Sequence, residues 1–306
     1  MILYLATGRG FARLEEREGT WEARFALEDS GAQCLAVDPA DPATVYAGCR
    51  GGGVKRSDDG GETWSDCALP EADVFSLAVS PADGAGTWEE LEALQAIPSR
   101  PSWSFPPRPW TSHVRWIAPD PHRAERLLVG IELGGLMHSD DGGATFSDHR
   151  PGAQRDVHGL AWHPHAAGRA YQAAGGGATF SVDGGHSWQA ADEGRTERYV
   201  WAVLPDPDDP DRWYVSAAPG PRQAHGSGPA AAGLFRRDGD RPWQRLGEPL
   251  DAMPYALATA EGTLFAGLGD GRVLRSDDAG EHWEALPERA EAVLALVAVG
   301  ESRDSR

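Results

Sequence analysis

The octapeptide SDDGGETW at residues 57–64 recurs, with small changes, along the whole chain. The closing aromatic residues of its copies are mostly about 42 residues apart, or nearly twice that distance. A fixed period of this size indicates a repeat protein, in which each repeat is one supersecondary unit. The close copies are SDDGGATF at 139–146, SVDGGHSW at 181–188 and SDDAGEHW at 276–283, and weaker copies end at Trp21 and Trp243.

Each copy has the residue types of a tight turn between two strands. The side chains of Ser57 and Asp59 can hydrogen-bond to nearby backbone N–H groups, and Gly60 and Gly61 can adopt positive φ angles at little steric cost. The closing aromatic residue then begins the next strand as a packing anchor. We therefore predict that the octapeptide fastens the fold, and that its Ser and Asp residues are not catalytic.

The pattern S-x-D-x-G-x-T/S-W resembles the Asp-box, or BNR, repeat of sialidase-like and sortilin-like β-propellers. Its four good copies extend over nearly the whole chain, so the resemblance implies an all-β propeller fold. It implies no particular activity, because one fold carries many functions. The Arg-Ile-Pro segment that sialidases have before their first box is absent here, and none of the sialidase catalytic residues is assigned. A sialidase proper is therefore not expected.

Short apolar strand patterns, separated by turn residues, fill the space between the octapeptides. One full unit has such patterns at 34–39, 44–48, 53–57 and 63–69, and four antiparallel strands of this length form one propeller blade. Inner strands are predicted again at 75–79, 114–118, 158–162, 200–204 and 255–259, and second strands at 126–131, 170–174, 213–217 and 263–267.

The third unit is abbreviated, because a sequence that looks like the end of a box, at 83–88, follows the 75–79 strand with no room for two middle strands. We predict a seven-bladed propeller in which this third blade is incomplete. The alternative is a six-bladed ring with one irregular sector, in which residues 89–97 would form a helical turn.

The two ends of the chain complement each other. Residues 2–8 read as a second strand with no inner strand before them, and residues 292–299 read as an inner strand with no blade after them. The C-terminal strand is therefore predicted to complete the first blade, which would leave no open sheet edge between the termini. Residues 1–299 are expected to form a single domain, followed by a disordered tail at 300–306.

Composition excludes several classes of protein. The chain has 306 residues with 38 Gly and 23 Pro, which suits many short strands and turns, and its formal net charge of -19 disfavours nucleic acid and anionic membranes as partners. No signal-peptide pattern opens the sequence, and no apolar run approaches membrane-spanning length. The three cysteines, Cys34, Cys49 and Cys67, read as reduced thiols, so a cytoplasmic protein is expected.

Two irregular segments interrupt the repeat, at 95–112 and 218–232. The first joins a fourth strand to the next inner strand and the second joins a second strand to a third, so both are predicted to lie on the face opposite the box turns. Because irregular loops on a regular scaffold often carry function, we expect this to be the working face. The simpler alternative is that the two loops only fill an enlarged channel.

Polar and aromatic residues gather at the strand ends of that face. The first hypothesis is a small-molecule or glycan-binding site, and a hydrolase of the glycosidase type is its enzymatic form. Two carboxylates would act as acid and base, histidines would carry protons, and arginines would hold an anionic group. The candidate catalytic residues are Glu132, Asp156, His158 and His113. The candidate ligand-binding residues are Arg50, Arg115, Tyr199, Trp201, Arg222, His225, Tyr255, Trp103 and Trp110.

Two alternatives remain open at this stage. No cofactor is predicted, but a divalent metal bound by His113, His158 and His225 with a carboxylate is a variant of the first hypothesis. The other alternative is a non-catalytic interaction propeller, in which aromatic residues of the 95–112 segment anchor a protein partner. For single residues a plainer role also applies: Arg115 and Glu132 would form an ion pair between adjacent strands.

Overall fold

A computed structural model describes residues 1–80, 88–104 and 112–300 of the chain. The chain divides into two compact units, the first formed by Met1–Leu77 with Ala252–Arg306 and the second by Ala78–Asp251. Each unit contains three antiparallel sheets built from consecutive short strands. The protein is thus an all-β propeller, and the described residues form six blades.

The first unit holds three four-stranded sheets. One has the order β23-β1-β2-β3 and combines both ends of the chain; its strands are β23 (Ala295–Val299), β1 (Ile2–Ala6), β2 (Phe11–Arg17) and β3 (Thr20–Ala26). The next contains β4 (Ala32–Val37), β5 (Val45–Cys49), β6 (Val54–Ser57) and β7 (Ser65–Asp66). The last contains β19 (Pro254–Ala260), β20 (Thr263–Leu268), β21 (Val273–Ser276) and β22 (Glu284–Ala285).

The second unit holds one three-stranded and two four-stranded sheets. The three-stranded sheet contains β8 (Val114–Asp120), β9 (Arg123–Ile131) and β10 (Gly135–Ser139), and a single bridge between His138 and Ser147 stands where its fourth strand would be. The other sheets contain β11 (Val157–Trp162), β12 (Ala170–Ala174), β13 (Gly177–Ser181) and β14 (Gln189–Ala190), then β15 (Tyr199–Asp206), β16 (Asp209–Ala218), β17 (Ala232–Asp238) and β18 (Gln244–Leu250). The helices are α1 (Glu92–Gln95), η1 (Arg100–Ser102) and α2 (Pro221–His225).

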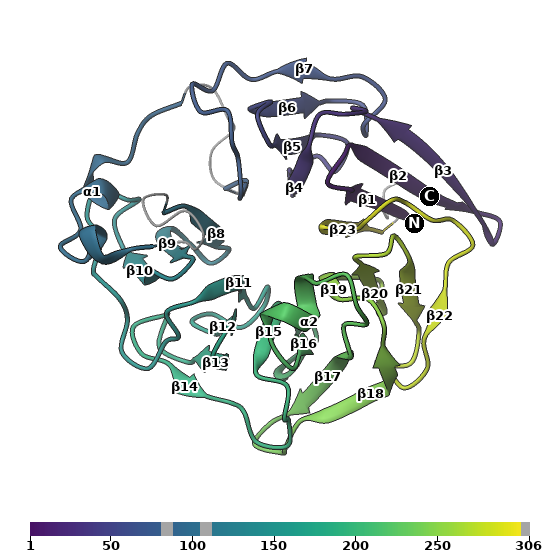
Figure 1. Cartoon of the computed structure of the whole chain (residues 1–306). Coiled ribbons are helices and arrows are strands. Elements are labelled where there is room, and N and C mark those ends of the chain that lie inside the picture. The colour runs from purple at the N-terminus through teal and green to yellow at the C-terminus, as the bar shows by residue number, and fades with distance from the viewer. Residues whose placement is uncertain (81–87, 105–111, 301–306) are drawn as a thin grey trace. The chain divides into compact units, whose positions relative to one another are not determined.

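The C-terminal strand completes the first blade, as the sequence predicted. Strand β23 pairs with β1 over its whole length, from Ile2 opposite Val299 to Ala6 opposite Ala295. Figure 1 shows β23, in yellow, beside β1, in purple. The pairing covers the edge of β1 with main-chain hydrogen bonds and ties the two ends of the sequence together.

The prediction of seven blades is wrong, and the six-bladed alternative holds. Residues 75–79 form no strand, and the described parts of the 67–113 stretch contain α1 and η1 in place of a sheet. The Val74 amide donates to the Cys49 carbonyl at 3.0 Å, and the Val74 side chain covers Gly48 of β5. Without two middle strands a lone strand has no partners of its own, so this segment packs as coil against the β4–β7 sheet. The predicted helical turn within 89–97 is present as α1.

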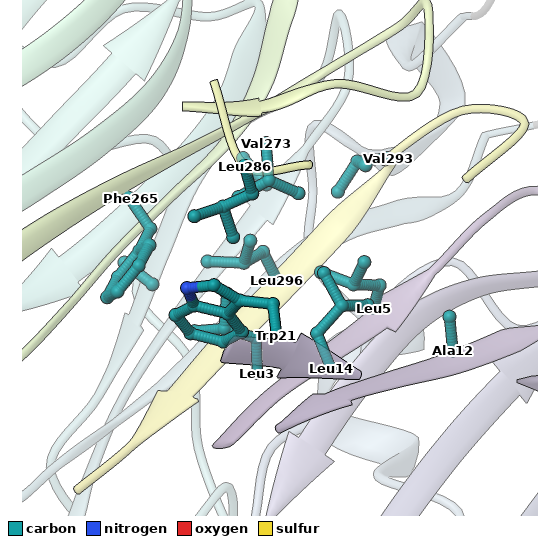
Figure 2. Packing of buried hydrophobic residues seen from close by; sticks show 12 residues of the cluster. Leu3, Leu5, Ala12, Leu14, Trp21, Phe265, Val273, Leu286, Val293 and Leu296 are labelled. Atoms are coloured by element: carbon teal, nitrogen blue, oxygen red, sulfur yellow. The ribbon is translucent and has the colours of Figure 1, made fainter. Parts of the chain in front are cut away.

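The closing aromatic residues pack between neighbouring sheets of a unit, as expected of anchors. Figure 2 shows Trp21 of β3 among Leu3, Leu14 and Leu296, with Phe265 of β20 beside it. The Trp21 and Phe265 rings meet edge to face, with centroids 6.2 Å apart. This cluster fills the space between the β1-containing sheet and the β19–β22 sheet. In the second unit Trp188 and Trp243 are likewise buried in apolar clusters.

The box turn is closed by side-chain hydrogen bonds. Ser57 Oγ donates to Asp59 Oδ1 at 2.7 Å and accepts from the Gly61 amide at 2.8 Å, while Asp59 also accepts from the Thr63 amide at 2.8 Å. The Trp64 indole donates to the Gly61 carbonyl at 3.1 Å. The same Ser-to-Asp and Gly-to-Ser bonds recur in the turns that begin at Ser139, Ser181 and Ser276.

These bonds to the ionised carboxylate change its acidity. Hydrogen bonds from the Thr63 hydroxyl and amide lower the pKa of Asp59 to about 2, and bonds from the His282 amide and ring lower that of Asp278 to about 2. Because the charged form is the one that is bound, the folded state favours ionisation of these groups more than the unfolded chain does.

We expect the box aspartates to make stability fall in acid. Their folded pKa lies below the unfolded value near 3.8, so their stabilisation is complete above about pH 4 and is lost as the pH falls toward 2. Replacing Asp59 by Asn should lower the melting temperature at pH 7, and the deficit should shrink between pH 4 and pH 2 in thermal melts. Asp240→Asn, at an exposed turn position, is the control. A deficit that stays constant down to pH 2.5 would contradict this account.

The fourth box carries a strained residue. Ala279 has a φ of 58°, where the equivalent glycines of the other boxes, Gly60, Gly142 and Gly184, have φ of 71–76°. An L-residue in this region costs about 1 kcal/mol, so Ala279→Gly should raise the free energy of unfolding by about 0.5–1 kcal/mol in urea titrations. The reverse change, Gly142→Ala, meets no atom within 4 Å and should lower it by about 1 kcal/mol. The assignment is wrong if Ala279→Gly lowers the free energy of unfolding or if Gly142→Ala raises it.

Candidate functional site

Eight of the predicted site residues meet in the second unit, at the sheet ends opposite the box turns. We call this group the polar cluster. Its members come from the starts of β8, β11 and β15, from the β9–β10 turn and from α2, and each contacts at least one other member. The polar cluster consists of His113, Arg115, Glu132, Asp156, His158, Tyr199, Trp201 and His225.

β-Bulges at the starts of the three inner strands direct side chains into the polar cluster. The register of β8 against β9 shifts between Val114 and Trp116, at Arg115, and the register of β11 against β12 shifts between Val157 and Gly159, at His158. In β15 the register also shifts just after Val200, at Trp201. A bulge inserts an extra residue and re-aims its side chain, and bulges are common beside binding sites.

Glu132 is the acidic centre of one side of the cluster. It follows β9 directly, and its Oε2 lies 2.8 Å from His113 Nε2 and 3.9 Å from Arg115 Nε. The Glu132 and His113 side chains are only 12% and 9% exposed. The predicted ion pair between Arg115 and Glu132 is therefore present, but the shorter contact of Glu132 is with His113.

His158 is the buried centre of the cluster, with a side chain that is 1% exposed. Its Nδ1 lies 2.7 Å from the Val200 carbonyl oxygen, and its Nε2 lies 3.5 Å from Asp156 Oδ2. Because a carbonyl oxygen only accepts, Nδ1 carries the proton, and in the neutral ring Nε2 carries the lone pair. The rings of Tyr199 and Trp201 lie 4.7 Å from the imidazole, centroid to centroid.

Aromatic and cationic groups close the remaining side. The Arg115 guanidinium lies over the Trp201 ring at 4.8 Å, and the Tyr199 hydroxyl lies 2.8 Å from His225 Nε2. Packing of the His225 ring lowers its pKa by loss of hydration, and the nearby His158 adds to this effect. The lowered pKa favours the neutral His225 ring, whose Nε2 can accept a hydrogen bond from the Tyr199 hydroxyl.

The polar cluster does not include five of the predicted ligand-binding residues. Arg222 lies exposed on α2, and Trp110 lies outside the described residues. Arg50 and Tyr255 belong to the first unit, where Arg50 donates to Gln33 at 3.3 Å and burial raises the pKa of Tyr255.

Trp103 corrects the prediction of an exposed anchor. It is 9% exposed and packs with Ile97 and Ile131 under the β8–β10 sheet, while its indole donates to Ser99 at 3.0 Å. Its apolar area is used to bury a sheet face that a complete neighbouring blade would otherwise cover. Trp103 therefore belongs to the core, and its ring is not available to a ligand or partner.

Sequence reasoning missed Gly175, which makes room for the Asp156 carboxylate. A Cβ atom at position 175 would lie 2.0 Å from Asp156 Oδ2, and the Gly175 amide donates to the Asp156 carbonyl at 2.9 Å. The run of three glycines at 175–177 was the available signal, because glycine within a strand connection often marks a close approach.

Two groups of side chains in the described residues have the donor types and spacing to hold a metal ion. Glu132, Asp156 and His158 offer ligand atoms that all lie within 4.8 Å of one another. His138, Asp140 and His186 do the same near the box turn that begins at Ser181. In the described part of the chain, neither α-helix has the length and apolar character needed to cross a bilayer.

Comparison with known proteins supports the fold. The family model of the BNR/Asp-box repeat matches residues 55–66, and no curated protein matches the sequence. Among solved structures, a chain of a nidogen/laminin complex has 13% identity and a TM-score of 0.57, with 97% of both chains covered. A GH74 enzyme from Niastella koreensis has 15% identity and a TM-score of 0.51, and a GH74 xyloglucanase from Xanthomonas campestris has 20% and 0.49.

Both GH74 alignments cover 93% of this chain but only 43% of the enzyme chain, so this chain spans less than half of either enzyme. At these identities the likeness concerns the fold alone. The chain is thus a β-propeller with a BNR/Asp-box repeat at residues 55–66 and similarly hydrogen-bonded box turns at Ser139, Ser181 and Ser276.

Proposed function

We propose that the polar cluster binds a small polar substrate and hydrolyses it, with glycosides as the substrate class. The observation that carries this proposal is the convergence of Glu132, Asp156 and His158, from two neighbouring sheets, to within 4.8 Å. Carboxylates and imidazoles are the side chains that transfer protons near neutral pH, and two carboxylates at a sugar bond are the minimum for glycoside hydrolysis.

The neighbouring residues have supporting roles. His113 holds the Glu132 carboxylate at 2.8 Å and can exchange a proton with it. Arg115 lies beside Glu132 and can pair with an anionic or hydroxyl group of the substrate. Trp201 is engaged by Arg115 and His158, so it orients these groups and is not assigned as a stacking platform for a sugar.

The GH74 enzymes add only that glycoside hydrolysis occurs on this fold elsewhere. The alternative of an interaction propeller loses one of its supports, because Trp103 is buried. The polar cluster itself therefore carries the argument for a small-molecule site. A flat protein interface does not require buried acid and imidazole groups.

Replacing Glu132 by Gln should abolish most of the activity. The change keeps the shape of the side chain but removes its charge and its ability to transfer a proton, so kcat/KM should fall by about 100-fold or more. The measurement is release of p-nitrophenol from a panel of p-nitrophenyl glycosides. Asp140→Asn is the matched control, since it changes a partly buried carboxylate beside histidines elsewhere in the same unit. The proposal is refuted if the wild type hydrolyses none of the glycosides in the panel, or if Glu132→Gln retains full activity.

Gly175→Ala should impair the site without removing any functional group. The new methyl would meet Asp156 Oδ2 at 2.0 Å and displace the carboxylate, so kcat/KM should fall by at least about tenfold. Gly228→Ala is the control, because a Cβ there meets no atom within 4 Å. Equal activities of the two variants, with equal melting temperatures, would mean that the position of Asp156 does not matter for the reaction.

A further inference from the structure

We propose that Glu132, Asp156 and His158 bind one divalent transition-metal ion, with a carboxylate oxygen from each acid and Nε2 of His158 as its ligands. This deepens the proposed function, because it rests on the same site. The two carboxylates would then act as metal ligands in place of acid and base, and a metal-bound water would supply the nucleophile. Its evidence is separate, however, and its test needs no substrate.

The first support is the state of His158. Its ring is 1% exposed, its Nδ1 donates to the Val200 carbonyl, and its Nε2 is buried with no hydrogen-bond partner in the described residues. A buried polar atom without a partner is costly and calls for an explanation. A histidine that ligates a metal through one nitrogen almost always donates its other N–H to a carbonyl or carboxylate. His158 already has this arrangement.

The second support is the geometry of the ligand atoms. Ligands bound tetrahedrally at about 2.1 Å from one ion lie roughly 3.4 Å from each other. His158 Nε2 and Asp156 Oδ2 are 3.5 Å apart, and the Glu132 oxygen lies within 4.8 Å of both. A small movement of the Glu132 carboxylate completes the set. Gly175 leaves the space that the Asp156 carboxylate occupies beside His158.

The third support is the charge within the group. Two carboxylates at this separation repel each other unless a proton or a cation lies near both. The Arg115 guanidinium forms an ion pair with Glu132 at 3.9 Å and stacks over Trp201, so it offsets one of the two negative charges. His113, 2.8 Å from Glu132, is placed as an outer partner that orients the ligating carboxylate. A divalent ion would neutralise both acids at once.

The second group of histidines shows what a compensated site looks like. Asp140 accepts from Arg126 at 3.1 Å and pairs with Arg123 at 3.2 Å, so guanidinium groups already balance its charge. His138 Nε2 contacts the Gly184 carbonyl at 3.0 Å. The residue types match those of the proposed site, but an ion there would have to displace or face two arginines. We therefore assign no ion to it.

The ligand set indicates the class of metal. One imidazole nitrogen with two carboxylate oxygens suits Zn²⁺ or Mn²⁺ better than Ca²⁺ or Mg²⁺, which favour oxygen ligands throughout. Three protein ligands leave a coordination position for water. An ion of this class lowers the pKa of a bound water and so supplies hydroxide near neutral pH.

The test is metal binding by the full-length chain after EDTA treatment and dialysis. Titration with Zn²⁺ by calorimetry, and with Co²⁺ by visible absorption, should give one equivalent bound by the wild type. Glu132→Gln and Asp156→Asn should each weaken the affinity at least about tenfold. His113→Gln should also weaken it, by about tenfold, because His113 orients the ligating carboxylate of Glu132 without binding the ion. Asp140→Asn should bind as the wild type does. The carboxylate variants are the primary test, since replacing the buried His158 ring would also disturb packing.

The inference is overturned if the wild type binds no stoichiometric Zn²⁺ or Co²⁺, if both carboxylate variants bind as tightly as the wild type, or if Asp140→Asn weakens binding equally. Its failure is distinguishable from failure of the proposed function. Hydrolysis that survives EDTA, without metal binding, would remove the ion and keep the hydrolase. Stoichiometric binding without turnover of any glycoside would keep the ion and remove the hydrolase.

Discussion

The hydrogen bonds from Ser and Asp side chains to the backbone of the box turn are the constraint on which the rest depends. In each good copy a serine hydroxyl accepts from the second glycine amide, and an aspartate accepts from the residues that follow. These bonds satisfy the turn locally and leave the closing aromatic residue to pack against the neighbouring sheet. With one end of each sheet fastened in this way, the opposite end is free to vary.

That opposite end is where the second unit gathers its reactive groups. The bulges at Arg115 and His158 interrupt the pairing of β8 and β11 just at their first residues, and the register of β15 shifts at the same level. At a bulge one residue is left out of the strand pairing, and its side chain points in a different direction from that expected in a regular strand. The regular part of the fold therefore tolerates three local irregularities that together build one cluster.

The chemistry of the polar cluster follows from negative charges and a buried nitrogen that the neighbouring side chains do not fully balance. Around Asp140, arginines supply the opposite charge and the hydrogen bonds, and the group is balanced. Around Glu132 and Asp156 the shortest contacts are with imidazoles, Arg115 pairs with Glu132 only at 3.9 Å, and Nε2 of His158 has no hydrogen-bond partner in the described residues. Buried groups that the protein itself leaves unpaired are the ones available to a substrate or an ion. This difference, and not residue type, separates the two histidine clusters.

The sequence by itself determined the repeat, the turn chemistry, the strand order and the return of β23 to β1, because each depends on local residue types and on their period. It also placed seven of the eight members of the polar cluster at the ends of recognisable strands, and the eighth, His225, in the irregular segment at 218–232. Only the tertiary structure decided the number of blades, the burial of Trp103 and the closeness of Gly175 to Asp156. These depend on which long-range partner each segment finds, and on bulges that shift side chains by one position. Neither leaves a periodic signal in the sequence.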